Sequence, residues 1–455
     1  MSDAQEIHNL LSDEQMSDAL STYSESSLEY ITDYNSGSYQ GTINFDTLVC
    51  ERKYVTWSDA WLSIPINVTG LSGVYDVTSL ASFKSSVLSF ITSCQVSITG
   101  NNTIFSDNNI SLINSIRLMV EKDLDFINAE GPEILYAGPG RLTTPSSTTM
   151  GGSVISNNDT TNSSFLTRIQ LLKQVSTGTT TWSTTLKVPL KYIHDFFAQL
   201  NFPMTNNRFN FTFGYATTSS LLSPWMVDLT LPTPTATLSV LPSVGACRLY
   251  YRSLKFLPSI NQDIVNKLNS GFQKRVSFRC SDFYLGAKAQ TTEPISSTIS
   301  PATIHPLRIW VLGCPVNSLS TQGSDTVNSA FCFPMRLTGL NALIQNTQYY
   351  QRNLDSPLEQ WDILKQQFPS NSSELSGSQL TYSDFFNNFR LNCIDVSRLK
   401  DRLKDPNSNV SIQVVAARDP AYTGSVDIYY VVERLQACTF MFNSSETKVI
   451  IGLSQ

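Results

Sequence analysis

One stretch of the chain changes its hydrophobic period halfway through, from that of a helix to that of a strand. In LKVPLKYIHDFFAQLNFPMTNNRFNFTFGY, apolar residues first recur at helical spacing over about three turns. These residues are Leu190, Ile193, Phe196, Phe197 and Leu200. After Pro203, aromatic residues alternate from Phe209 to Tyr215, as on a strand with one aromatic face. The pattern predicts a short helix placed between strands of a β-rich chain.

The same layout returns in the second half of the chain. The segment FRLNCIDVSRLKDRLKDPNSNVSIQVV indicates a strand, a short helix, a proline, asparagines and a second strand. Its Pro406 falls 203 residues after Pro203. Between the two copies lies the segment 216–245, whose four prolines are typical of a semi-rigid connector. The repeated layout indicates two β-sandwich domains of similar design in tandem.

The chain therefore divides into four predicted parts. These are a flexible acidic N-terminal arm (1–40), a first sandwich (41–215), a Pro-rich connector (216–245) and a second sandwich (246–455). Within them we expect a strand over 61–68, a helix over 80–91, a hairpin over 95–105, and strand, helix and strand over 247–280. Residues 142–164 predict a long polar surface loop.

The charge distribution argues against a nucleic-acid-binding surface. The chain has 37 acidic and 31 basic residues, and ten of the acids lie in residues 1–51, before the first basic residue, Arg52. The arm is therefore negative and the rest is close to neutral, without the clustered Lys and Arg that a phosphate backbone requires. We expect no sequence-specific binding of nucleic acid. No signal peptide or membrane span is expected, since the most apolar run, VDIYYVVERLQACTFMF, is interrupted by charges.

Residues that carry chemistry are scarce. The three histidines, His8, His194 and His305, do not lie at metal-ligand spacing, and no CxxC motif occurs. His194 is expected to be a satisfied surface histidine whose neighbour Asp195 points away from it. The eight cysteines are expected to be free, buried thiols: Cys50, Cys94, Cys247, Cys280, Cys314, Cys332, Cys393 and Cys438. The pattern predicts no catalytic residue, no metal ligand and no cofactor, although sequence alone leaves a Cys–His dyad open.

Two glycines, Gly138 and Gly140, begin a GxG pattern, but Thr143 stands where a phosphate-binding loop needs its third glycine. They indicate a turn. Carboxylates that face each other across a cleft, as a β-sandwich hydrolase would need, leave no sequence signature. We therefore expect a protein that is not an enzyme, and keep the hydrolase as a third possibility.

Several segments together resemble the double jelly-roll major capsid proteins, and among them those of polinton-like viruses and virophages. In the first half these segments are SFKSSVLSFITSCQVSITGNNTIFS and LKVPLKYIHDFFAQLNFP. In the second half they are CRLYYRSLKFLPS, CFPMRLTGLNALIQNTQYYQRN and YSDFFNNFRLNCIDVSRL. The resemblance extends over most of residues 42–445 in order and spacing, without a strict motif.

The resemblance implies an all-β fold of two tandem eight-stranded jelly rolls with short inserted helices. It also implies a structural subunit that forms a homotrimer, a pseudo-hexameric capsomer in the icosahedral shell of a DNA virus. Expected partners are neighbouring capsomers, penton and minor capsid proteins; the expected location is the virion, after synthesis in the host cytoplasm. Contact with a membrane stays open. The acidic arm is expected to order on assembly.

The alternative is a trimeric β-sandwich protein for viral attachment or glycan binding. It would share the strands and the polar loops. A glycan-binding protein is expected to carry aromatic residues at the tip of a loop, and the loop 142–164 contains none. The tandem layout favours the capsid interpretation.

Overall fold

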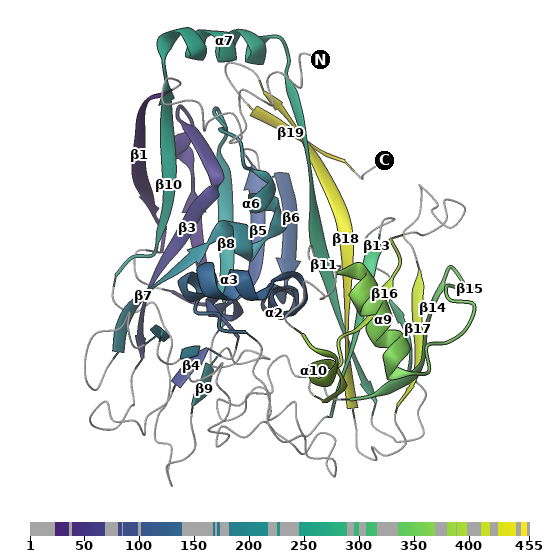
Figure 1. Ribbon diagram of the computed structural model, residues 1–455. Coiled ribbons are helices and arrows are strands. Elements are labelled where there is room, and N and C mark those ends of the chain that lie inside the picture. Colours follow the sequence, from purple (N-terminus) through teal and green to yellow (C-terminus); the bar gives the residue numbers. More distant parts are fainter. Residues whose placement is uncertain are drawn as a thin grey trace.

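The structure is a computed structural model dominated by antiparallel strands (Figure 1). It describes residues 23–35, 39–68, 81–83, 85–98, 102–138, 167–168, 171–172, 182–216, 225–227, 245–288, 295–299, 306–315, 335–368, 380–387, 389–397, 411–418, 426–442 and 447–452. The predicted loop 142–164, most of the connector, residues 398–410 of the second repeat, His8 and His305 lie outside these ranges.

The first sandwich consists of two four-stranded sheets, with strand orders β1-β10-β3-β7 and β2-β8-β5-β6 (Figure 1). Its strands are β1 (Tyr23–Thr32), β2 (Thr42–Asp46), β3 (Tyr54–Val68), β5 (Ile91–Ile98), β6 (Asn102–Asn108), β7 (Trp182–Pro189), β8 (Phe209–Tyr215) and β10 (Arg248–Phe256). The predicted strand over 61–68 is confirmed as the end of β3, and the aromatic strand as β8. The predicted hairpin is confirmed as β5 and β6, which pair antiparallel.

The core of this sandwich is built from the aromatic faces of β3 and β8. Trp57 of β3 has no exposed surface. Its ring meets those of Phe211 and Phe209 edge to face, with centroids 5.2 and 6.0 Å apart. This geometry places the positive ring edge against a negative ring face, which aromatic pairs favour. The period-2 pattern of β8 therefore points its phenylalanines into the space between the two sheets.

The second sandwich has the strand orders β11-β18-β13-β16, with β19 added on β18, and β12-β17-β14-β15. Its strands are β11 (Gln273–Lys288), β12 (Ile295–Ile299), β13 (Pro306–Pro315), β14 (Leu337–Ile344), β15 (Thr347–Gln348), β16 (Asn392–Asp395), β17 (Ile412–Arg418), β18 (Val426–Phe442) and β19 (Thr447–Gly452). Two short strands, β4 (Ala81–Phe83) and β9 (Trp225–Val227), pair separately.

Strand β18 lies between the two hydrophobic cores. Tyr430 and Val432 belong to the core between the two sheets of the second sandwich. Tyr429 and Val431 point the other way, into a core that is continuous with the first sandwich. A strand buried on both faces has an almost continuous apolar sequence, which explains why this run resembles a membrane span. Among the described residues, none of the helices is long and apolar enough to cross a membrane.

Short helices fill the ends and sides of the sandwiches (Figure 1). They are α2 (Ile110–Glu121), α3 (Leu124–Ala129), α5 (Leu190–Ile193), α6 (Asp195–Gln199), α7 (Pro258–Asn269), α9 (Pro357–Gln367) and α10 (Tyr382–Asn387), with 3-10 turns η2 (Leu48–Cys50), η3 (Val87–Phe90) and η4 (Gly131–Ile134). The predicted strand, helix and strand over 247–280 are confirmed as β10, α7 and β11. Helix α6 of the first sandwich contacts β11 of the second.

The predicted helix over 80–91 is wrong. The segment forms β4, the turn η3 and the start of β5. The backbone of Ser86 is extended, and its hydroxyl accepts a hydrogen bond from the amide of Leu88 at 3.2 Å. Such a cap stabilises a single turn beside an extended residue, and the apolar residues are buried without a continuous helix.

The predicted three-turn helix over 190–200 is interrupted at His194, which separates α5 from α6. His194 has extended backbone angles, φ −153° and ψ 138°. Its Nδ1 accepts a hydrogen bond from the amide of Phe196 at 3.1 Å and so caps the start of α6. The apolar residues that suggested one helix are buried in both pieces.

The flexible arm expected over residues 1–40 is wrong for Tyr23–Thr32, which forms β1 and pairs with β10 throughout its length. The strand is anchored because Ile31 points into the core, with 8% of its surface exposed. In addition, Glu29 accepts hydrogen bonds from the hydroxyls of Tyr251 and Ser253 at 2.9 and 2.8 Å. The many serines that suggested flexibility lie on an edge strand.

Strand β10 lies in the first sandwich, between β1 and β3. The second sandwich was predicted to begin at residue 246, before this strand. The chain passes from one sandwich to the other through α7, which Figure 1 shows between the upper ends of β10 and β11. The eight strands of the first sandwich are thus complete only with a strand from beyond the connector. Pairing between distant segments of this kind leaves no local sequence pattern.

Candidate functional site

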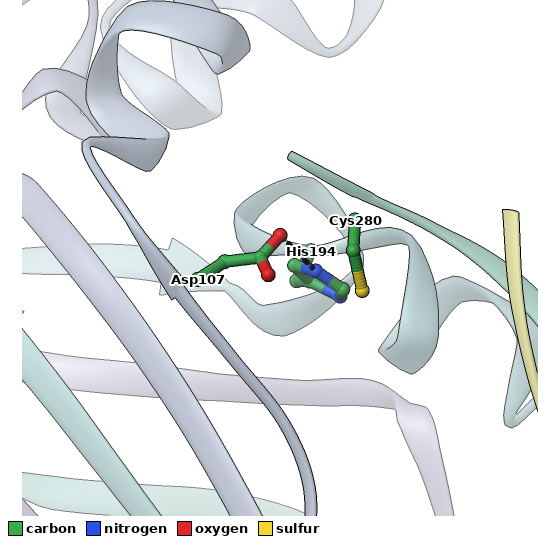
Figure 2. A group of neighbouring side chains, drawn as sticks. All are labelled: Asp107, His194 and Cys280. Carbon is green, nitrogen blue, oxygen red and sulfur yellow. Dashed lines mark hydrogen bonds and ion pairs between the residues drawn. The ribbon is translucent and has the colours of Figure 1, made fainter. Parts of the chain in front are cut away.

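Three side chains with metal-binding atoms meet where the two sandwiches join (Figure 2). Asp107 comes from β6, His194 from the break between α5 and α6, and Cys280 from β11. One possible ligand atom of each lies within 4.8 Å of the others, and all three residues are buried. This is the site at which the residues could hold a metal ion or form a nucleophile with its base.

The protonation of His194 tests whether a metal ion fits. Because Nδ1 accepts the amide hydrogen of Phe196, the ring proton must lie on Nε2, which is 3.2 Å from an oxygen of Asp107. A metal ion at Nε2 would move the proton to Nδ1, where it would face the amide hydrogen and break the cap of α6. The arginine Arg434, 4.0 Å from Asp107, adds positive charge beside the site. The donor set therefore does not fit a metal ion.

The same geometry does not provide a Cys–His dyad. Both nitrogens of His194 are already hydrogen-bonded, and the thiol of Cys280 donates to Oε1 of Gln436 at 3.3 Å. Burial raises the pKa of the Cys280 thiol well above its ordinary value, with the charge of Asp107 acting in the same direction. A buried, protonated thiol whose histidine is engaged elsewhere is a poor nucleophile.

His194 is therefore a buried structural residue, and the expectation of a surface histidine is wrong. Only 3% of its surface is exposed, and its ring stacks on Phe105 with centroids 3.9 Å apart. No local pattern indicates this burial, because the aromatic partners Phe105 and Phe278 come from other elements. The neighbouring Asp195 accepts hydrogen bonds from Arg279 and takes part in a second cluster.

The second cluster is an ionic network centred on Glu433 of β18. The side chain of Glu433 has no exposed surface. Its Oε1 accepts hydrogen bonds from Nε and Nη2 of Arg117 in α2, at 2.9 and 2.6 Å. Its Oε2 accepts from Nη1 of Arg308 at 3.3 Å and from the indole of Trp310 at 3.1 Å. The carboxylate is thus held by groups from both sandwiches.

Arg279 of β11 extends the network to two further acids. Its guanidinium donates to Asp195 of α6 and to Glu121 of α2, with Nη2 at 3.3 Å from Asp195 and 3.1 Å from Glu121. Glu121 is also 3.7 Å from Arg308. Three arginines and three carboxylates therefore balance at the junction. Buried charges are tolerated only when they are paired and hydrogen-bonded in this way.

The pKa values follow from this arrangement. Burial opposes the charge of Glu433, but Arg117, Arg279 and Arg308 outweigh it and hold its pKa at about 2. Burial likewise opposes the charge of Asp195, and Arg117 and Arg279 lower its pKa to about 2. Both carboxylates therefore stay charged throughout the physiological range. The network therefore links the sandwiches permanently. Neither Glu433 nor Asp195 changes its charge near neutral pH, because the pKa of each is about 2.

A cavity of about 360 Å³ opens beside this network. Its wall includes Arg117, Glu121, Asp195 and Arg279, together with the apolar side chain of Leu118. The charges of these four polar residues are already satisfied by one another. These four residues therefore present no unpaired charge to the cavity.

The network was not predicted, although one feature of the sequence points to it. Glu433 and Arg434 interrupt the most apolar run of the chain. Two adjacent charged residues in an otherwise apolar strand indicate oppositely charged partners elsewhere in the fold. Arg117, the partner of Glu433, lies 316 positions away, so no local spacing could have named it.

Two eight-stranded or larger sandwiches, joined side by side through strands buried on both faces, define the double jelly-roll class of fold. The chain is similar to a chain in the cryo-EM structure of the Sputnik virophage, with a TM-score of 0.58 and 12% identity over 96% of this chain and 90% of that one. It is also similar to the mavirus major capsid protein, with a TM-score of 0.52 and 12% identity over 94% and 90%.

A third similar structure is VP54 of PBCV-1, fitted into a reconstruction of the virophage Sputnik, with a TM-score of 0.50 and 8% identity over 94% of this chain and 98% of that one. No family model matches the sequence, and no curated protein matches it. The similarity at these identities establishes the fold. The double jelly roll that the sequence resemblance implied is therefore confirmed.

Proposed function

We propose that this chain is the major capsid protein of an icosahedral DNA virus and forms homotrimeric, pseudo-hexameric capsomers. The observation that carries the proposal is the double jelly-roll fold, shared over 94–96% of the chain with a chain of the Sputnik virophage, the mavirus major capsid protein and VP54 of PBCV-1. The role is structural, without catalysis, in keeping with the engaged histidine and thiol described above.

The geometry gives this function a physical basis. A chain with two similar sandwiches supplies two of six roughly equivalent corners, and three copies related by a threefold axis close a ring with six. Such a block can tile a shell only if its two halves keep a fixed relative position. The buried network around Glu433 and the shared strands β11 and β18 supply that rigidity.

Further parts of the proposal concern domains, partners and location. The two sandwiches are the two domains, with the passage between them at α7. The partners are neighbouring capsomers, penton and minor capsid proteins, and the location is the virion, after synthesis in the host cytoplasm. The near-neutral charge of the chain beyond the arm supports contacts with protein in preference to nucleic acid.

The mass of the purified chain in solution tests the proposal. Light scattering should give about three times the 50.5 kDa of the chain, because the capsomer is a closed trimer. A monomer at all protein and salt concentrations would contradict it. A trimer that also binds defined sugars on a glycan array would favour the alternative, a trimeric attachment or glycan-binding protein.

A further inference from the structure

The outer face of the sheet β1-β10-β3-β7 carries a row of aromatic side chains. Three of its strands, β1, β10 and β3, bury their inner residues in the core. These residues are Ile31, Leu249 and Leu62. One position along, Tyr30, Tyr250 and Trp61 are paired across the strands and point outward. Tyr250 stacks on Trp61 with centroids 5.2 Å apart, and Tyr30 lies 5.5 Å from Tyr250.

Exposed apolar surface continues along β1. Leu28 and Tyr30 are 57% and 51% exposed, which is unusual for large apolar side chains that lie next to each other on one face of a strand. Strand β1 is also the edge of its sheet, as Figure 1 shows. Both features mark a surface that another segment covers.

The charges on this face are unbalanced. Lys187 pairs with Glu133, and Lys255 lies 3.9 Å from Glu25. Arg248 and Arg252, in contrast, have no carboxylate partner among the described residues. The guanidinium of Arg248 lies over the ring of Tyr30 at 4.6 Å, and that of Arg252 reaches only the hydroxyl of Ser26 at 3.4 Å.

The residues that precede β1 have the complementary composition. Residues 1–22 contain five acids and no Lys or Arg, together with the aliphatic residues Ile7, Leu10, Leu11, Met16 and Leu20. This segment enters β1 at Tyr23, at one end of the face. At about 3.3 Å per residue it can extend to ~70 Å, more than twice the length of β1, so it can fold back across the sheet.

We infer that residues 1–22 of this chain dock on the outer face of the sheet β1-β10-β3-β7 of the same chain. Their acids pair with Arg248 and Arg252, and their aliphatic residues cover Leu28, Tyr30 and the aromatic row. Docking on the same chain is favoured because the tether keeps the segment at a high local concentration. The inference goes beyond the proposed function and does not depend on it.

Hydrogen exchange of the full-length chain, followed by mass spectrometry, tests the inference. Amides of residues 1–22 should exchange about tenfold more slowly than in a synthetic peptide of the same sequence. The double variant Arg248→Glu/Arg252→Glu should abolish this protection, and about 0.5 M salt should reduce it by screening. The milder Arg248→Gln/Arg252→Gln variant should lose part of the protection of residues 1–22. It replaces the charge-reversal variant in the test if charge reversal disturbs folding.

The matched control reverses two exposed charges elsewhere, Arg275 of β11 and Lys365 of α9, and should keep the protection. Exchange of residues 1–22 at the rate of the free peptide would overturn the inference. So would protection that the Arg248 and Arg252 variants leave unchanged. Protection that disappears on dilution would show that the segment belongs to a neighbouring copy and would overturn docking on the same chain.

Discussion

Glu433 of β18 accepts two hydrogen bonds from the guanidinium of Arg117, which lies 316 positions earlier in α2 of the other sandwich. The contact joins the two jelly rolls through a carboxylate that water does not reach. Arg308 and Trp310 occupy its second oxygen. Glu433 therefore helps to fix the relative position of the two sandwiches.

Replacing Glu433 with Gln should destabilise the protein by about 3–5 kcal/mol, because it leaves the buried Arg117 and the partly buried Arg279 and Arg308 with one carboxylate too few. Denaturation in urea measures the loss. The matched control is Arg352→Gln, which breaks the pair of Arg352, 77% exposed, with Glu359 and should cost less than about 1 kcal/mol. Equal effects of the two substitutions would contradict the account of the junction.

Acid should weaken the junction in a defined range of pH. The pKa of Glu433 is about 2 in the folded chain and about 4.5 in the unfolded one. A lowered pKa contributes stability above the unfolded value, and that stability is lost as the pH falls through the folded value. The free energy of unfolding should therefore fall between about pH 4.5 and 2, with Glu433 contributing on the order of 3 kcal/mol.

The pH dependence can be assigned by comparing variants. In Glu433→Gln the decrease between pH 4.5 and 2 should be smaller than in the wild type, because the group that takes up the proton is gone. Denaturation in urea at a series of pH values measures both curves. Parallel curves would show that Glu433 does not carry this dependence.

His194 should contribute to stability both by packing and as a cap. His194→Ala removes the acceptor for the amide of Phe196 and leaves a cavity beside Phe105, at a cost of about 2–4 kcal/mol. His194→Asn keeps an oxygen that can accept this hydrogen bond, and should recover about 1 kcal/mol. Thermal unfolding compares the two. An Asn variant less stable than the Ala variant would contradict the capping role.

Zinc should not stabilise the protein. Although Asp107, His194 and Cys280 meet within 4.8 Å, the proton of His194 lies on the nitrogen that a metal ion would need. The unfolding temperature should therefore be the same with EDTA and with excess Zn²⁺. A rise with Zn²⁺ that is absent in Cys280→Ser would show that the site binds metal.

Two deletions should separate residues 1–22 from β1. Removal of residues 1–22 takes away only their docking on the outer face and should lower the free energy of unfolding by about 1–1.5 kcal/mol, which corresponds to tenfold protection. Removal of residues 1–32 also takes away Ile31 and the hydrogen bonds of Glu29, at a cost on the order of 3 kcal/mol. Denaturation in urea measures both, and similar stabilities would show that β1 is dispensable.

Elements with their own local pattern were predictable from the sequence. The aromatic alternation from Phe209 to Tyr215 fixed β8, because one face of that strand is buried against Trp57. The strand, helix and strand around α7 were predictable for the same reason. The tandem layout, read from two distant copies, indicated two sandwiches.

What depends on distant partners was not predictable. The serine-rich segment before Thr32 is a strand because β10, more than 200 residues later, offers it an edge. His194 interrupts a helix because its ring caps the next one, and Glu433 is charged in a buried strand because Arg117 lies opposite. In each case the local composition favours another structure, and tertiary contacts decide the outcome.

Electron microscopy of the purified chain tests the central claim most directly. If the chain is a capsomer subunit, images of the main species should show a trimer with a six-cornered outline, into which three copies of the double jelly roll fit. A monomer that shows two sandwiches and no ring, at all protein concentrations, would contradict the account.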